Sequence, residues 1–323
     1  MAQAPTERDK NWPMSTTTAP VDQSARDAAD AKVDRKNRWA NRSLILPAII
    51  FLIILTQIPF LVTIGFSTIR WNLLYPNKVG FTWFQNYITV FTSGDLWPSI
   101  LATVLITALS VIFSLLFGLL FAILLDRKFR GRAIARTLMI TPFLLMPAAA
   151  ALIWKYSMFD TNIGMINWLL RTLGIPEIAW STNFPLWTVV IVLTWQFTPF
   201  MMLILLAGLQ GQSKEVIEAA TVDGASGWRI FTWITLPHLR MYIEIAVLLG
   251  TIIMIQVFDP IAIMTKGTGG TKTLSYLLYE RAFIGLNVGE AAAYGVVIVI
   301  LTIIVASIAL RTLFKVFMAG GDR

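Results

Sequence analysis

The 323-residue chain contains no cysteine and a single histidine, His238. It therefore offers no thiol nucleophile, no disulfide, no zinc cluster and no pair of haem ligands. The sequence also lacks the G-x-x-x-x-G-K-[ST] pattern of a phosphate-binding loop, so we expect no ATP site in this chain. Charged residues make up only 14% of it, and the carboxylates are scattered rather than grouped. These absences argue against an enzyme, and we expect no cofactor or metal bound by this chain itself.

Apolar residues dominate what is present. They make up 56% of the sequence, and the mean hydropathy is +0.70, far above that of an ordinary soluble domain. A helix needs about 20 mostly apolar residues to cross the hydrocarbon core of a membrane, and such runs recur along the chain. We therefore predict an all-α membrane protein with six spans, at about residues 44–69, 98–125, 137–156, 186–210, 239–264 and 291–311.

The basic residues predict the orientation of these spans. If residues 1–43 and 316–323 are cytoplasmic tails, 19 of the 26 Lys and Arg residues lie on the inside, as the positive-inside rule requires. Several tryptophans then fall in or beside the outer loops, as in an interfacial aromatic belt. The net charge of +8 thus reflects topology, and we expect no nucleic-acid partner. Residues 1–43 are polar and lack an apolar period, which predicts a largely disordered basic tail.

One stretch between the fourth and fifth spans is too polar to lie within lipid. In "EAATVDGASGWRIFTWITLP", residues 218–237, charged and small residues replace the apolar run. We expect Ser213 to cap a short helix that stops at Gly224, and a second short helix over residues 228–236. Pro237 would then begin the fifth span. Such a helix-turn-helix in a predicted cytoplasmic loop suits a docking element, the alternative being an amphipathic loop resting on lipid.

The spacing of this loop resembles the EAA loop of ATP-binding-cassette (ABC) importer permeases. The matching positions are Glu218-Ala219-Ala220, Gly224, Ile234 and Leu236-Pro237. The segments "GMINWLLRTLGIPEIAW", "LTWQFTPFMMLILLAGLQ" and "GGTKTLSYLLYERAFIGLNVGEAAAYG" are similar to the carbohydrate-uptake branch, the MalF-like permeases. The resemblance covers most of the chain from about residue 38.

This resemblance implies a function and a set of partners. It implies the type I ABC importer permease fold in a bacterial cytoplasmic membrane, with loop 213–237 inserted into a cleft of a cytoplasmic ATPase dimer. Glu218 would be its acidic anchor, Gly224 its turn, and Asp223 a further docking residue. ATP and Mg²⁺ would bind to the ATPase subunits, whose closure drives alternating access. The remaining partners would be a second, MalG-like permease chain and an extracytoplasmic solute-binding protein.

Polar side chains within the spans are the candidates for solute contact, because burying them in lipid is costly. An amide beside aromatic rings suits a sugar, which presents hydroxyls and C–H faces. Gln256 and Asp259 stand three residues apart and would share a helix face. For Gln196 and Gln256, the alternative to solute contact is hydrogen bonding between helices. For Asp259 the alternative is a helix cap or an ion pair with Lys266 or Arg281. The candidates are Trp195, Gln196, Phe197, Phe200, Met254, Gln256 and Asp259.

Other functions fit the sequence less well. A permease for glycerol phosphate would favour Arg or Lys deep in the spans, and none stands at mid-depth. A secondary transporter would show an inverted repeat and would leave the loop at 213–237 unexplained. The sequence therefore favours an importer permease for a neutral sugar or polyol. Pro142, Pro147 and Pro199 are expected to interrupt the third and fourth spans where they line a cavity or a neighbouring helix.

Overall fold

The computed structural model describes residues 46–320, which are mostly helical. The predicted tail at residues 1–43 lies outside the described residues. The chain divides into two units, Met1–Phe60 and Leu61–Arg323. The described part of the first unit belongs to the apolar helix Leu46–Ser67, most of whose large apolar side chains are exposed. Such a surface needs lipid or a protein partner to cover it.

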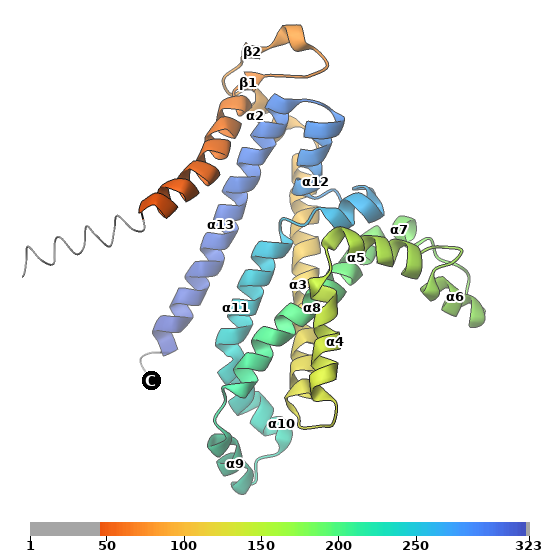
Figure 1. Cartoon of the computed structure of the whole chain (residues 1–323), viewed down its shortest axis with the longest axis vertical. Helices are drawn as coiled ribbons and strands as arrows, with labels where there is room; N and C mark the ends of the chain where they lie inside the picture. Colours follow the sequence, from red (N-terminus) through yellow and green to blue (C-terminus); the bar gives the residue numbers. More distant parts are fainter. Residues whose placement is uncertain (1–45, 321–323) are drawn as a thin grey trace, which may run out of the picture. The chain divides into compact units, whose positions relative to one another are not determined.

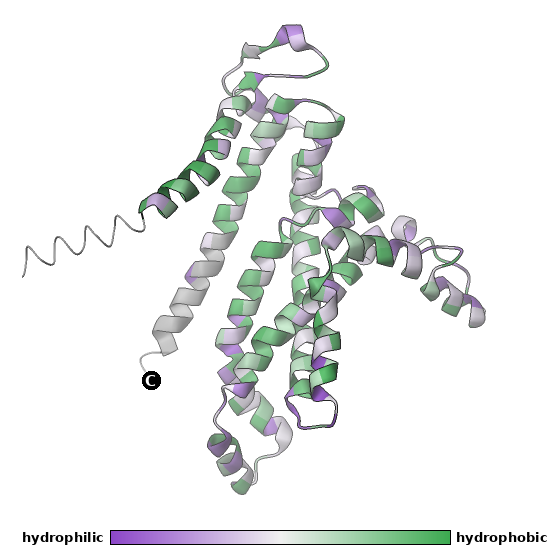
Figure 2. Cartoon of the chain, viewed as in Figure 1, coloured by the Kyte–Doolittle hydropathy of each residue, from purple (hydrophilic) through white to green (hydrophobic). Residues whose placement is uncertain are grey.

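Within the described residues, four further helices are long and apolar enough to cross a membrane. They are α3 (Leu96–Asp126), α8 (Pro185–Gln210), a helix over Gly227–Met254, and the first part of α13 (Val288–Gly320). With a bent helix pair counted as one broken span, the number reaches the six predicted. Figure 2 shows apolar residues along most of these helices, and α9 as one of the more polar segments.

The core of the larger unit forms where α3 and α8 lie side by side, with α4 and α11 against them (Figure 1). The buried face of α3 consists mainly of small residues, among them Ser110, Ser114, Gly118 and Ala122. A Cβ atom added at Gly118 would lie 2.7 Å from the Cβ of Met201 on α8. Small residues let two helices approach this closely, and close packing is what holds membrane helices together.

The third span is broken rather than continuous. Helix α4 (Arg132–Leu144) and helix α5 (Pro147–Ile153), which continues in the π-helical turn η2 (Trp154–Met158), meet at an angle of 101°. Met146 is extended, with ψ 133°, because the residue before a proline is kept out of the helical region. The prediction of a span over residues 137–156 did not include this bend, although Pro147 was correctly expected to interrupt it. The other two prolines do not end a helix, because Pro142 lies inside α4 and Pro199 lies inside the unbroken α8.

The fifth span begins and ends earlier than predicted. A π-helical turn, η3 (Phe231–Thr235), joins α10 (Gly227–Ile230) to α11 (Leu236–Met254) without a break, and the Leu236 amide donates to the Phe231 carbonyl. The wider turn accommodates Pro237, which lacks an N–H of its own. The second short helix predicted at 228–236 is thus the first part of the fifth span. The span ends at Met254, ten residues before the predicted boundary at 264.

The remaining elements form the connections at the two ends of the larger unit. Strands β1 (Ile69–Arg70) and β2 (Gly80–Phe81) pair antiparallel, with Ile69 opposite Phe81, and η1 (Pro76–Lys78) lies between them. The other short helices are α2 (Gln85–Thr92), α6 (Met165–Thr172), α7 (Trp180–Asn183), α9 (Lys214–Val222), η4 (Ile261–Thr265), α12 (Leu274–Tyr279) and η5 (Glu280–Ile284). Helix α13 extends into the residues 316–320 that were expected to be a tail.

Candidate functional site

Residues 213–237, the docking hairpin, form a helix, a tight turn and the start of the next helix. Helix α9 ends in a Schellman turn, in which the Ala225 amide donates to the Ala220 carbonyl and the Gly224 amide to the Thr221 carbonyl, at 3.0 and 3.1 Å. Gly224 has φ +78°, a conformation that side chains disfavour. Gly224 therefore takes the predicted position, whereas Ser213 stands at the start of α9 without a side-chain capping bond.

Most side chains of the docking hairpin are exposed and are not covered by other described parts of the chain. Glu218, Ala219 and Asp223 are exposed and Ala220 is half-buried. Neither Glu218 nor Asp223 forms an ion pair within the described residues. Large apolar side chains are also uncovered: Val222 is 87% exposed, Trp228 74% and Trp233 79%.

The last three predicted docking residues lie within the first turns of the fifth span. Ile234 is half-buried, while Leu236 and Pro237 are exposed. Exposed carboxylates beside exposed tryptophans form a surface suited to a protein partner rather than to water alone.

Gln196 holds the break in the third span. Its side chain is 2% exposed, and its Nε2 atom donates to the Leu145 carbonyl at 3.0 Å, at the point where α4 ends. The bond supplies a partner to a carbonyl that the interrupted helix has left free. Phe143 lies beside it, with its ring stacked on Phe200 at 5.3 Å and edge-on to Phe197 at 6.0 Å. The structure thus brings three predicted residues, Gln196, Phe197 and Phe200, to one place.

The other predicted pathway residues are scattered. Trp195 points away from Phe197, and its ring lies 5.6 Å from that of Trp154. Met254 is buried in the core that includes Phe197. Gln256 lies in an exposed turn beyond the end of α11, so the prediction that it shares a helix face with Asp259 was wrong. Asp259 begins the next helical segment and is half-buried.

Asp259 does not form the ion pair expected for it. Within the described residues it lies in no salt bridge, and Arg281 pairs with Asp95 and Glu290 instead. The reason is geometric: Arg281 belongs to η5, which packs on α13, the helix that includes Glu290.

Lys155 was missed by the sequence reasoning. It lies in η2, and its Nζ donates to the carbonyl of Ile263 in η4 at 2.7 Å. The contact ties the second half of the broken third span to the segment that follows the fifth span. A lysine at the end of an apolar run was the available signal, but no pattern in the sequence identifies its carbonyl partner.

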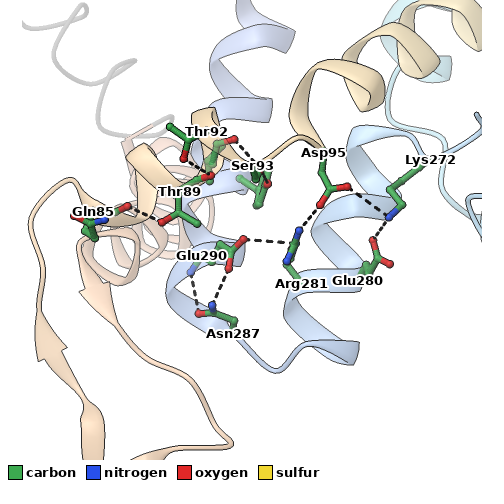
Figure 3. A network of polar contacts seen from close by, with 12 residues as sticks. Gln85, Thr89, Thr92, Ser93, Asp95, Lys272, Glu280, Arg281, Asn287 and Glu290 are labelled. Atoms are coloured by element: carbon green, nitrogen blue, oxygen red, sulfur yellow. Dashed lines mark hydrogen bonds and ion pairs between the residues drawn. The ribbon is translucent and has the colours of Figure 1, made fainter.

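A charge network joins four elements at the end of the larger unit opposite the docking hairpin (Figures 1 and 3). Arg281 pairs with Asp95, and its Nε lies 3.5 Å from Glu290, which is 8% exposed. Lys272 contacts Glu280 at 2.8 Å and Asp95 at 4.0 Å. Burial works against the charged form of Arg281, yet the neighbouring carboxylates Glu290 and Asp95 raise its pKa above the ordinary value. The outer charge network, as we call these five residues, keeps α12 and η5 against α3 and α13.

Comparison with known proteins identifies the family. The family model described as "Binding-protein-dependent transport system inner membrane component" matches residues 114–318. The chain belongs to this family. It is therefore a multi-pass membrane protein and a permease subunit of an ABC importer. The matched region includes the docking hairpin, the broken third span and most of the outer charge network.

Two relatives match most of the permease. The trehalose transport system permease protein SugA of Mycobacterium tuberculosis is 32% identical over 86% of this chain and 90% of its own length. The trehalose/maltose transport system permease protein MalF of Thermococcus litoralis is 32% identical over 78% of this chain and 84% of its own.

A solved structure has the same fold. A chain of a bacterial ABC transporter involved in import of the acidic polysaccharide alginate aligns with a TM-score of 0.74 and 20% identity, covering 88% of this chain and 99% of that one.

Proposed function

We propose that this permease forms half of the membrane pathway of an importer for a neutral sugar or polyol. A homologous permease chain would form the other half, and an extracytoplasmic binding protein would deliver the solute. A cytoplasmic ATPase dimer, holding ATP and Mg²⁺, would drive alternating access through the docking hairpin. The exposed docking hairpin is the observation on which this proposal rests most, because Glu218 and Asp223 form no ion pair within the described residues and its tryptophans are largely uncovered.

The orientation we propose places the docking hairpin and both chain ends in the cytoplasm. Within the larger unit, α9 and the connection between α3 and α4 lie at the same end (Figure 1). That connection and the start of α4 include five basic residues, as a cytoplasmic loop should. The outer charge network would then face the opposite side, where the binding protein docks.

A neutral carbohydrate is the solute that the site favours. Gln196 offers an amide oxygen that accepts no hydrogen bond within the described residues, beside the rings of Phe143, Phe197 and Phe200. Aromatic faces cover the C–H surfaces of sugars, and an amide oxygen accepts from their hydroxyls. The names of the two trehalose-transporting relatives support the same class. Among the other predicted pathway residues, Met254 would be the one that the fifth span contributes to the lining of the pathway.

The first test is purification of the tagged permease from its own membrane in mild detergent, with mass spectrometry of whatever remains bound. We expect a cassette ATPase and a second six-span permease. Uptake by the reconstituted complex with its binding protein should then favour neutral sugars over glycerol phosphate. Isolation of the chain alone, in a preparation where other membrane complexes stay intact, would contradict the proposal. Preferential uptake of glycerol phosphate would contradict only the solute class.

A further inference from the structure

A cavity of about 650 Å³ lies between α3, α4 and α8, on a different face of α8 from Gln196 and Phe197. Aromatic and aliphatic side chains form its walls, and no charged residue lines it. Its lining includes Phe113, Phe117 and Phe121 of α3, Leu138 of α4, and Trp187 and Trp195 of α8. A volume of this size is within the range of about 300–1,000 Å³ that holds small organic ligands.

The chemistry of the walls suits a sugar poorly. Thr194 and Thr198 supply the only side-chain hydroxyls in the lining, and Thr198 already donates to the Thr194 carbonyl at 2.6 Å, which leaves the unpartnered Thr194 hydroxyl as the one that is free. A buried hydroxyl without a hydrogen-bond partner costs about 1–3 kcal/mol, and a sugar would bring several. The cavity therefore suits a hydrocarbon chain.

The cavity is continuous with the lipid-facing surface of the spans. Phe117 on α3 and Leu138 on α4 line the cavity and are themselves exposed. Beside them, Leu116 and Leu120 of α3 are also exposed. These apolar side chains belong to the spans, and lipid covers such a surface wherever the second permease chain does not. An acyl chain can thus enter from the side without crossing a polar rim.

Basic side chains gather just beyond one end of the cavity. The connection between α3 and α4 contains Arg127, Lys128 and Arg130, all exposed, and Arg136 follows on α4. The carboxylate next to these basic residues, Asp126, lies 4.0 Å from a different one, Arg132. Arg127 stands six residues after Phe121 on α3, which is about 9 Å along the axis at the usual rise per residue. Basic groups next to a crevice between membrane helices are suited to an anionic headgroup.

We propose that this crevice is a binding site for an anionic phospholipid. One acyl chain fills the cavity between α3, α4 and α8, and the phosphate lies on the basic connection that follows α3. With the orientation proposed above, the lipid comes from the inner leaflet. Its role is to fill the space beside α4, the inner half of the broken third span, and so to hold that half against α8.

Photocrosslinking tests the site directly. The purified permease complex is reconstituted with phosphatidylglycerol that has a diazirine near the middle of one acyl chain, and with phosphatidylcholine bearing the same chain. After irradiation, labelled peptides are identified by mass spectrometry. We expect phosphatidylglycerol to label residues 113–121 or 138–142 at least fivefold more than phosphatidylcholine does. Equal labelling by the two lipids would overturn the proposal, because the headgroup would then not be recognised.

Two variants separate the headgroup from the cavity. Replacing Arg127, Lys128 and Arg136 together by glutamine should abolish the preference for phosphatidylglycerol, whereas Arg229→Gln, a basic residue of the docking hairpin, should leave it unchanged. Thr198→Phe should fill the cavity and lower labelling by both lipids. Absence of labelling at the cavity in the intact wild-type complex would mean that a helix of the second permease or the solute occupies it, and would overturn the proposal.

Discussion

The two ends of the larger unit are built in different ways. At one end, the docking hairpin is shaped mainly by the main-chain bonds of the Schellman turn at Gly224. A weak cap adds to them, in which the Arg229 amide donates to Ser226 Oγ at 3.4 Å. At the other end, charged side chains link α3, α12, η5 and α13. Hydroxyl bonds add to them, such as Ser93 to Tyr294 at 2.7 Å and the Leu274 amide to Thr103 at 2.9 Å.

The docking hairpin therefore leaves its charged side chains free for a partner, whereas the outer charge network pairs its charged side chains with one another. The hairpin has its shape without using its carboxylates or tryptophans, so these remain available to another protein. The outer charge network uses its charges internally, and an apolar cluster that includes Leu96, Leu277 and Tyr294 lies with it. Substitutions at the hairpin should therefore change function and leave stability alone, and substitutions in the network should do the reverse.

The largest functional effect is expected from Glu218→Lys. Reversing this exposed charge should prevent the ATPase subunit from binding and lower ATP-driven uptake at least tenfold. The permease itself should stay within about 0.5 kcal/mol of wild-type stability, because the side chain has no partner within the described residues. Complex yield, uptake and thermal unfolding are the measurements. Glu215→Lys, an exposed position on the same helix, is the control and should retain most of the uptake. Wild-type yield and uptake in Glu218→Lys would contradict the docking role.

The largest effect on stability is expected from Arg281→Met. The change leaves the nearly buried Glu290 without its cation, and Asp95 with Lys272 alone, at 4.0 Å. Breaking a fully buried pair costs about 3–5 kcal/mol, and partial exposure here lowers the expected loss to about 1–3 kcal/mol. Thermal unfolding of the purified permease should show a lower midpoint, with the ATPase still bound.

Two comparison variants sharpen this result. Arg281→Lys, which keeps the charge, should recover part of the loss. Arg171→Met removes an exposed arginine that lies 3.4 Å from Glu177, and should cost less than about 1 kcal/mol. Equal losses in Arg281→Met and Arg171→Met would show that the outer charge network has no special stability.

The sequence predicted the number of spans and the hairpin turn because both follow from local patterns. Apolar run length marks a span wherever the bilayer is the solvent, and a glycine with positive φ ends a helix regardless of its surroundings. The end of the fifth span was misplaced because the apolar run continues past Met254. The helix nevertheless ends there, and Pro260 stands at the start of the next helical segment, where its missing N–H costs least.

The contacts that assemble the site could not be predicted in the same way. Gln196 and Leu145 are 51 residues apart, and Lys155 and Ile263 are 108 apart. Each glutamine or lysine in a span has many carbonyls available, and only the packing of α8, α5 and η4 selects one. The 101° bend has a local cause in Pro147, but its size depends on where α8 supports the two halves.

A smaller effect is expected at the break itself. Gln196→Leu removes the donor to the Leu145 carbonyl and should lower stability by about 1–2 kcal/mol, since a buried acceptor loses its partner. Thermal unfolding gives the loss, and the KM for uptake reports separately on solute contact. Gln256→Leu, in an exposed turn, should change stability by less than about 0.5 kcal/mol. Wild-type stability in Gln196→Leu would mean that the break is held by the phenylalanine rings alone.

The smallest expected effect is a pH dependence at Asp160, in the loop that follows the third span. Its Oδ1 accepts from the amides of Ile163 and Asn162, at 3.0 and 2.9 Å, and these bonds lower the pKa of the carboxyl below its ordinary 3.8. The lowered pKa means that the stabilisation is complete above 3.8 and is lost as the pH falls through the pKa of the folded protein. Hydrogen exchange of the amides of residues 162–164, compared with Asp160→Asn at each pH, measures it. The difference between the two proteins should be constant from neutral pH down to about 4 and should shrink below that. A difference that shrinks well above pH 4 would assign the effect to another group.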